Sequence, residues 1–125
     1  MQNMSMQICT TINLFNIFYL DELAQHVKTW NPDFWYINIL HHPVEFDIQQ
    51  IPNEIKEQIV NKLKTTTTYQ QEIQTAIDYI NGEPSYKINN WKKALTDKVK
   101  VIDSVRQENF ADTFKILNSL LRIYD

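Results

Sequence analysis

The chain has 125 residues, which is the size of one domain or of a part of one. Hydrophobic residues make up 43% and charged residues 22%, so a folded protein is expected rather than a disordered one. The net charge of −3, from 12 basic and 15 acidic residues, has the wrong sign for a surface that binds nucleic acid. No nucleic acid is therefore expected among the partners.

Membrane and export signals are missing from the amino-acid sequence. No apolar run approaches the roughly 18 residues of a membrane span. The opening MQNMSMQ lacks the basic and apolar regions of a signal peptide. Cys9 is the one cysteine, which excludes an internal disulfide, and Gly82 is the one glycine, which excludes a glycine-rich phosphate loop. These features predict a cytoplasmic protein with no membrane partner.

The first third of the chain predicts a strand, a helix and a second strand. Residues 6–13 are rich in β-branched side chains, and residues 16–29 switch to a helical spacing of apolar side chains that Asn13 or Asn16 can cap. Residues 34–40 are apolar with little alternation, as in a strand covered on both faces. This βαβ unit should have parallel strands and is too small to stand alone. Its first strand has no earlier strand to pair with, which predicts a fragment.

The rest of the chain predicts about four helices. They cover residues 51–63, 69–82, 90–106 and a last helix that Asn109 caps. The second of them carries an apolar stripe of Ile73, Ala76, Ile77 and Ile80. The predicted fold class is therefore an α-rich α/β fold, with a βαβ stub over residues 1–43 and a helical extension over residues 44–125.

Two histidines follow the second strand in the sequence WYINILHHP, from Trp35 to Pro43. The carboxyl ends of parallel strands line the ligand sites of barrels and open sheets, so His41 and His42 are candidates to face a substrate or cofactor. A metal site needs three or four ligands, and the remaining histidine, His26, lies on the polar side of the first helix. The alternative is that one histidine of the pair packs at the strand end and the other is solvated.

Three asparagines are the other candidates to face a ligand. Asn13 and Asn16 follow the first strand, and Asn38 lies within the second. An amide inside an apolar strand needs hydrogen-bond partners, which either a ligand or the neighbouring backbone can provide. Cys9 is expected to be a small buried side chain. No nucleophile, base and acid form a catalytic motif, so no catalytic or metal-binding residue is assigned.

Several stretches together resemble a known family. They are TTINLFNIFYLDEL from Thr10 to Leu23, WYINILHHPVEFDIQQIPNEIKEQI from Trp35 to Ile59, and VIDSVRQENFADTF from Val101 to Phe114. These resemble the later part of radical S-adenosylmethionine (radical SAM) proteins with a twitch-type C-terminal extension, which are common in bacteriophages and bacteria. The resemblance covers nearly all of residues 7–116 and rests on the order of its motifs, such as N-x-L-H-x-P at Asn38. The family's ending often continues as P-E-L/M, whereas this chain reads KIL.

The resemblance implies a parent protein with cofactors that this chain does not hold by itself. The family uses a CxxxCxxC loop, whose three thiolates bind a 4Fe-4S cluster that cleaves S-adenosylmethionine. Cys9 alone does not replace those thiolates, so no cofactor is expected in this chain. By the resemblance it is the C-terminal end of a partial barrel, and its partner is an N-terminal radical SAM half. Asn13, Asn38 and His41 then match positions that can face the shared site.

Three hypotheses follow from the sequence. The first is a C-terminal fragment of a radical SAM protein that is not catalytic by itself. The second is an independent phage or bacterial interaction module, which binds a protein partner by strand addition at an exposed edge of the stub. The third is a small enzyme that uses His41 or His42 as a base.

Overall fold

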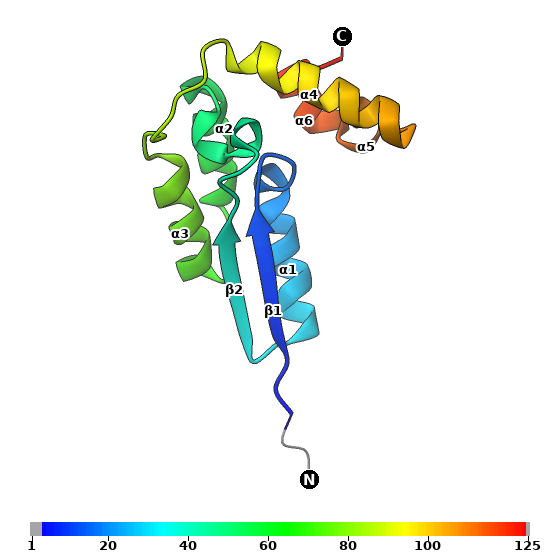
Figure 1. The fold of residues 1–125 in the computed structure, drawn as a ribbon. Coiled ribbons are helices and arrows are strands. Elements are labelled where there is room, and N and C mark those ends of the chain that lie inside the picture. The colour runs from blue at the N-terminus through cyan, green and yellow to red at the C-terminus, as the bar shows by residue number, and fades with distance from the viewer. Residues whose placement is uncertain (1–3, 125) are drawn as a thin grey trace.

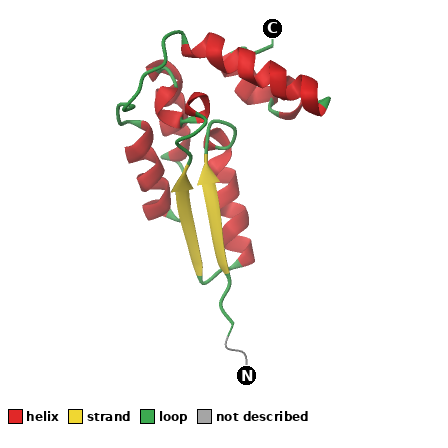
Figure 2. Ribbon diagram, viewed as in Figure 1, coloured by secondary structure: helices red, strands yellow, loops and turns green. Residues whose placement is uncertain are grey.

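The computed structural model describes residues 4–124 and is dominated by helices (Figures 1 and 2). The strands and α-helices are β1 (Gln7–Ile12), α1 (Leu20–Trp30), β2 (Phe34–Ile39), α2 (Asn53–Leu63), α3 (Gln70–Ile80), α4 (Trp91–Arg106), α5 (Phe110–Thr113) and α6 (Lys115–Leu121). Three single turns of 3-10 helix are η1 (Ile17–Tyr19), η2 (Val44–Phe46) and η3 (Ile48–Gln50). The predicted α-rich α/β class is confirmed at this level.

The two strands lie side by side and parallel, as predicted for the βαβ unit. Gln7 is the partner of Phe34 at one end of the pair, and Ile12 is the partner of Ile39 at the other. The ladder continues at the carboxyl end, where the Leu40 amide donates to the Ile12 carbonyl at 2.9 Å. Figure 1 shows α1 running beside β1 and α3 beside β2, with α4, α5 and α6 across the carboxyl end of the strands.

The sheet is covered on one face only, which corrects the expectation that β2 is covered on both. Trp35 is buried at 5% exposure, whereas Phe34 and Tyr36 are 55% and 48% exposed. Side chains alternate between the faces of a strand, so the uncovered face carries every second residue of each strand. That face, called the open face below, consists of Gln7, Cys9, Thr11, Phe34, Tyr36 and Asn38. Cys9 is therefore exposed, and the expectation that it is buried was wrong.

The turn between β1 and α1 is closed by its own asparagines. Asn16 occupies the position before η1, but its side chain does not cap that helix. Instead its Oδ1 accepts the Asn13 amide at 2.9 Å, and its Nδ2 donates to the Thr11 carbonyl at 2.8 Å. Asn13 Oδ1 accepts the Phe15 amide at 2.8 Å. The predicted cap is therefore replaced by a hydrogen-bonded turn, because the backbone amides nearest to both side chains belong to the turn.

The C-terminal helices follow the predicted pattern with one difference. The apolar stripe of α3, from Ile73 to Ile80, is fully buried as expected. Asn109 Oδ1 accepts the Asp112 amide at 3.2 Å, which confirms the predicted cap. The last helix is divided at Phe114, whose φ of −119° and ψ of 62° interrupt the helix between α5 and α6. The Phe114 ring packs 5.7 Å from the Phe15 ring, so the division accompanies a contact with the first third of the chain.

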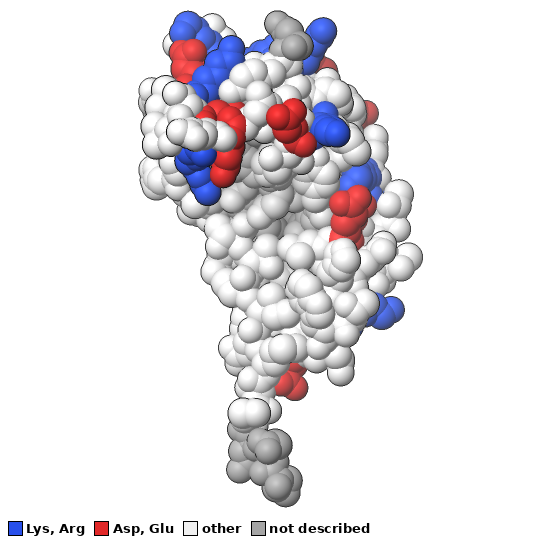
Figure 3. Space-filling model, turned by 90° about the vertical axis from the view of Figure 1, so that its right-hand side faces the viewer, with Lys and Arg blue, Asp and Glu red and all other residues white. Residues whose placement is uncertain are grey.

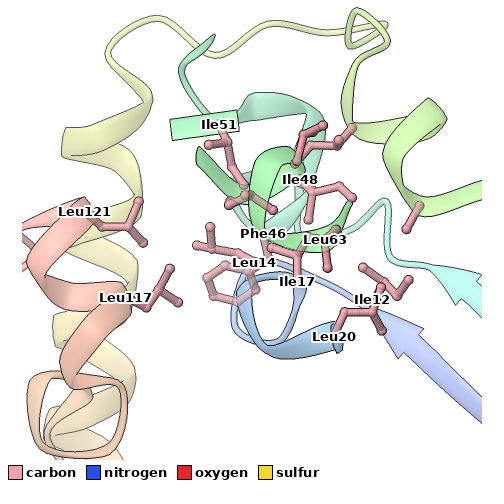
Figure 4. Close-up of a cluster of buried hydrophobic side chains, with 14 of the residues drawn as sticks. Ile12, Leu14, Ile17, Leu20, Phe46, Ile48, Ile51, Leu63, Leu117 and Leu121 are labelled. Carbon is pink, nitrogen blue, oxygen red and sulfur yellow. The ribbon is translucent and has the colours of Figure 1, made fainter. Parts of the chain in front are cut away.

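One hydrophobic core joins the stub to the helical extension. Its residues run from Ile12 near the end of β1 to Ile123 near the end of the chain. Figure 4 shows Leu117 and Leu121 of α6 directed toward Leu14 and Phe46, with Ile12 and Leu20 at the far side of the cluster. The side chains of Leu14 and Leu117 are both 0% exposed. The apolar surface of the turn after β1 is therefore buried by the helical extension as well as by α1.

Charged side chains are unevenly distributed over the molecule. On the face drawn in Figure 3 they gather over the upper part, where the C-terminal helices lie, and the lower part carries few. Between residues 4 and 43 the stub contains only four Asp, Glu, Lys or Arg side chains, namely Asp21, Glu22, Lys28 and Asp33. Within residues 4–124, the helices are all too short or too polar to cross a membrane.

Candidate functional site

A hydrogen-bonded group of side chains lies at the carboxyl end of β2. The chain passes from β2 through η2 and η3, and Asp47 Oδ1 accepts the Gln49 amide at 3.0 Å at the start of η3. The hydroxyl of Tyr79, near the end of α3, lies 3.0 Å from each carboxylate oxygen of Asp47. The same hydroxyl lies 2.9 Å from His41 Nδ1. His41, Tyr79 and Asp47 form the candidate site.

The number of hydrogens fixes the direction of these bonds. The Tyr79 hydroxyl has one hydrogen, and the Asp47 carboxylate only accepts, so that hydrogen points to Asp47. The Tyr79 oxygen is then an acceptor for His41, which places a hydrogen on Nδ1 of the ring. In the neutral imidazole, Nε2 is left with its lone pair. The side chain of His41 is 62% exposed, so solutes can reach Nε2.

Tyr79 is held in its neutral form at ordinary pH. Burial raises the pKa of the Tyr79 hydroxyl well above its usual value, and the hydrogen bond to Asp47 and the charge of that carboxylate act in the same direction. Tyr79 is therefore a hydrogen-bond donor and not a base. It orients His41 and links the ring to Asp47 in a chain of two hydrogen bonds.

The group borders an open pocket of about 500 Å³. Both histidines line it, so the structure brings His41 and His42 together as the sequence suggested. The other lining side chains include Tyr79, Glu83 and Tyr86 from the end of α3 and the loop that follows. The sequence analysis missed Tyr79 and Glu83, because no motif surrounds them and only the packing of α3 beside β2 brings them to this end of the sheet.

The three asparagines do not join this pocket. Asn13 and Asn16 are engaged in the turn after β1. Asn38 lies on the open face, where its Nδ2 donates to Cys9 Sγ at 2.8 Å. The structure therefore divides the five candidates into a histidine pair at the pocket, an asparagine pair in a turn, and one asparagine on the open face.

The side chains do not fit the iron–sulfur cluster of the family that the sequence resembles. Such a cluster needs three thiolates, and the chain offers only the thiol of Cys9, on the open face. Over residues 4–124 there is also no group of three or more His, Cys, Asp or Glu side chains arranged to hold a metal ion.

A second candidate site is the outer edge of β1, the side of the strand whose backbone groups point away from β2. The Met6 and Ile12 carbonyls accept amides of β2 or its flanks, so even-numbered residues of β1 direct their backbone groups toward β2. In a parallel pair, the residues between them direct both backbone groups the other way. These are Gln7, Cys9 and Thr11. The Thr11 carbonyl accepts Asn16 Nδ2, and the other outward groups find no hydrogen-bond partner within residues 4–124.

No family model, curated protein or solved structure matches this chain. The similarity to radical SAM proteins stays a prediction from the quoted residues.

Proposed function

We propose that this chain is a protein-interaction module that binds an extended segment of a partner along the outer edge of β1. The observation that carries the proposal is the row of outward backbone groups of Gln7, Cys9 and Thr11, most of which lack a partner within residues 4–124. Such a row is a template for one more strand, because an added strand supplies the missing donors and acceptors.

The size of the sheet supports the same proposal. A sheet of two strands is marginally stable, and a third strand adds both hydrogen bonds and packing. The segment Gln7–Ile12 also contains neither proline nor a charged side chain, two of the features by which proteins prevent strand addition. On the other side of the sheet, α3 runs beside β2, and the Trp35 ring of β2 packs 4.9 Å from the Tyr69 ring.

The open face indicates what the partner segment should look like. Its six side chains are uncharged, and the rings of Phe34 and Tyr36 stack on it with centroids 5.9 Å apart. A strand added at β1 places every second side chain on this same face. The partner segment should therefore alternate, with neutral or apolar side chains on the side of Phe34 and Tyr36 and no charge there.

A second candidate uses the same edge. If the chain is the C-terminal part of a radical SAM protein, the earlier strands of the partial barrel pair with β1 and the partner is the cluster-bearing N-terminal half. The parallel strands, with His41 and His42 at their carboxyl end, favour this version. It predicts that a separately expressed N-terminal half carries the CxxxCxxC loop.

Co-expression of the chain with the product of the reading frame upstream of its gene tests both versions. The complex should co-purify, and hydrogen exchange should slow at the outward amides of Gln7, Cys9 and Thr11. The inward amides of Ile8 and Thr10 are already bonded to β2 and serve as internal controls. A complex that forms without slowing exchange at the outward amides contradicts edge binding.

A matched pair of variants sharpens the test. Gln7→Pro removes one outward amide and leaves the bonds between β1 and β2 in place, since proline is tolerated at an edge whose amide faces outward. Gln7→Ala removes the same side chain but keeps the amide. Binding should weaken in Gln7→Pro and persist in Gln7→Ala. Equal binding by the two variants argues against an added strand.

A further inference from the structure

The N-termini of α2 and α4 face a common hollow of about 390 Å³. Asn53 and Glu54 from the first turn of α2, and Trp91 with its preceding residue Asn90 from α4, line it together with Lys56 and Lys87. These define the α2–α4 hollow. Neither helix is capped by the side chain that precedes it, Pro52 in one case and Asn90 in the other. The first amides of each helix therefore remain available as donors.

A buried lysine with no carboxylate in contact with its amine lies in the wall of this hollow. Lys56 is 7% exposed, and its Nζ makes one long hydrogen bond, 3.5 Å to the Gly82 carbonyl. No carboxylate of residues 4–124 lies within 4.0 Å of the Lys56 amine. An ammonium group has three hydrogens to donate, and within residues 4–124 this one has a single acceptor, the Gly82 carbonyl. Buried charges in proteins are almost always paired, so an amine with one long hydrogen bond and no carboxylate in contact points to an anion that completes the site.

The local charge favours an anion despite two carboxylates. Glu54 and Glu83 also line the α2–α4 hollow and offset the charges of Lys56 and Lys87. Each helix N-terminus adds the equivalent of about half a positive charge, so the sum is about +1. Burial lowers the pKa of Lys56, and the charge of Lys87 acts in the same direction, whereas the charges of Glu83 and Asp47 raise the pKa only in part.

We infer that the α2–α4 hollow binds a phosphate group, with Lys56 as its main counter-ion and the first amides of α2 and α4 as further donors. Phosphate suits the site because it carries up to two charges and several acceptor oxygens. These oxygens can accept from the donors of the two helices and the two lysines together. This site is separate from the edge of β1, so it does not depend on the proposed interaction.

Titration with inorganic phosphate at constant ionic strength, followed by amide NMR, tests the inference. The amides of Asn53, Glu54, Trp91 and Lys92 should shift and saturate together. Methyl phosphate, run in parallel, tells whether the site takes a phosphate group on a larger molecule or the free ion alone. Acetate should bind at least about tenfold more weakly, since it offers one charge and two oxygens. Equal binding of acetate, or shifts that never saturate, overturns the inference.

Four variants tie the binding to the hollow. Lys56→Met keeps the length of the side chain and should weaken phosphate by about tenfold or more, because a charge-assisted hydrogen bond is lost. Lys87→Met changes an exposed residue, so the fold should stay intact, and phosphate binding should weaken less than in Lys56→Met. Glu83→Gln should strengthen binding, which a purely structural role of these residues does not explain. Lys64→Met, at the far end of α2, is the control. Unchanged binding in both Lys87→Met and Glu83→Gln refutes the site even if Lys56→Met does not fold.

Discussion

The hydroxyl of Tyr79 lies 3.0 Å from both carboxylate oxygens of Asp47, although the two residues are 32 positions apart. This contact joins the end of α3 to the loop that follows β2. Because the same hydroxyl meets His41 Nδ1 at 2.9 Å, the position of the histidine depends on the packing of α3 and not on its own loop alone.

Replacing Tyr79 by Phe should destabilise the fold by about 1–2 kcal/mol, because the Asp47 carboxylate loses a donor while it stays largely buried. His41 also loses its acceptor, so its ring should become mobile. Urea unfolding measures the first effect, and the NMR resonances of the His41 ring report the second. Tyr86→Phe changes an exposed tyrosine of the same pocket and should leave stability unchanged. Equal stability of the Tyr79 and Tyr86 variants contradicts the hydrogen-bond chain.

The stability should fall at alkaline pH, in part through Tyr124. Its hydroxyl donates to Asp103 Oδ2 at 2.7 Å, and this hydrogen bond, with burial and the charge of Asp103, raises the pKa of Tyr124 to about 12. The folded protein therefore holds this proton more tightly than the unfolded chain, whose tyrosines titrate near 10.0. The stabilisation is complete below pH 10 and is lost as the pH rises toward about 12.

Tyr124→Phe should accordingly be less stable at pH 8 but lose less stability between pH 8 and pH 11 than the parent protein does. Urea unfolding at the two pH values measures both quantities. A variant with the same loss of stability over this interval as the parent shows that Tyr124 titrates normally in the folded state.

Much of the fold could be predicted from the sequence, because the local residue patterns agree with the elements that form. The β-branched run before Asn13 predicts β1, and the spacing of Ile73, Ala76, Ile77 and Ile80 predicts the buried face of α3. The exposure of the open face could not be predicted from the sequence. Phe34 and Tyr36 are aromatic, so the sequence of residues 34–40 is typical of a strand covered on both faces. These rings are exposed because no element of residues 4–124 packs on the open face.

The candidate site could be predicted from the sequence only in part. The position of His41 and His42 after a parallel strand predicted the end of the sheet at which both histidines line the pocket. Their contacts were not predictable, because Tyr79 reaches this end through tertiary packing between elements far apart in the chain. Asn13 and Asn16 do not line the pocket for a local reason, since their short amide side chains form hydrogen bonds with the backbone of the turn that contains them.

Substitutions on the two faces of β2 should have opposite outcomes. Ile37→Asp places a carboxylate among the side chains that pack on the inner face, and should destabilise the protein by about 3 kcal/mol or more, to unfolding or precipitation. Tyr36→Asp changes the neighbouring residue on the open face and should remain folded and soluble. Circular dichroism melting of both variants is the measurement. A soluble Ile37→Asp protein that melts cooperatively means that the strand assignment is wrong.

The chain should bind no iron–sulfur cluster by itself, since one cysteine does not replace three thiolates. Anaerobic incubation with iron and sulfide, followed by desalting and absorption spectroscopy, should give no stoichiometric cluster. Cys9→Ser should behave in the same way as the parent chain. Stoichiometric iron and sulfide that Cys9→Ser abolishes would overturn this prediction.

The stub and the helical extension should unfold as one unit, because Leu117 of α6 packs into the same core as Leu14 of the turn after β1. Leu117→Ala should cost about 2–5 kcal/mol, the usual range for truncating a fully buried leucine. Its neighbour Ile116 is 58% exposed, so Ile116→Ala should cost far less. If the core is shared, Leu117→Ala should speed hydrogen exchange at the β-sheet amides of Ile8 and Thr10 as much as at those of α6, because exchange at both then requires global unfolding. Faster exchange in α4–α6 alone, with the sheet amides unchanged, would show that the two parts open separately.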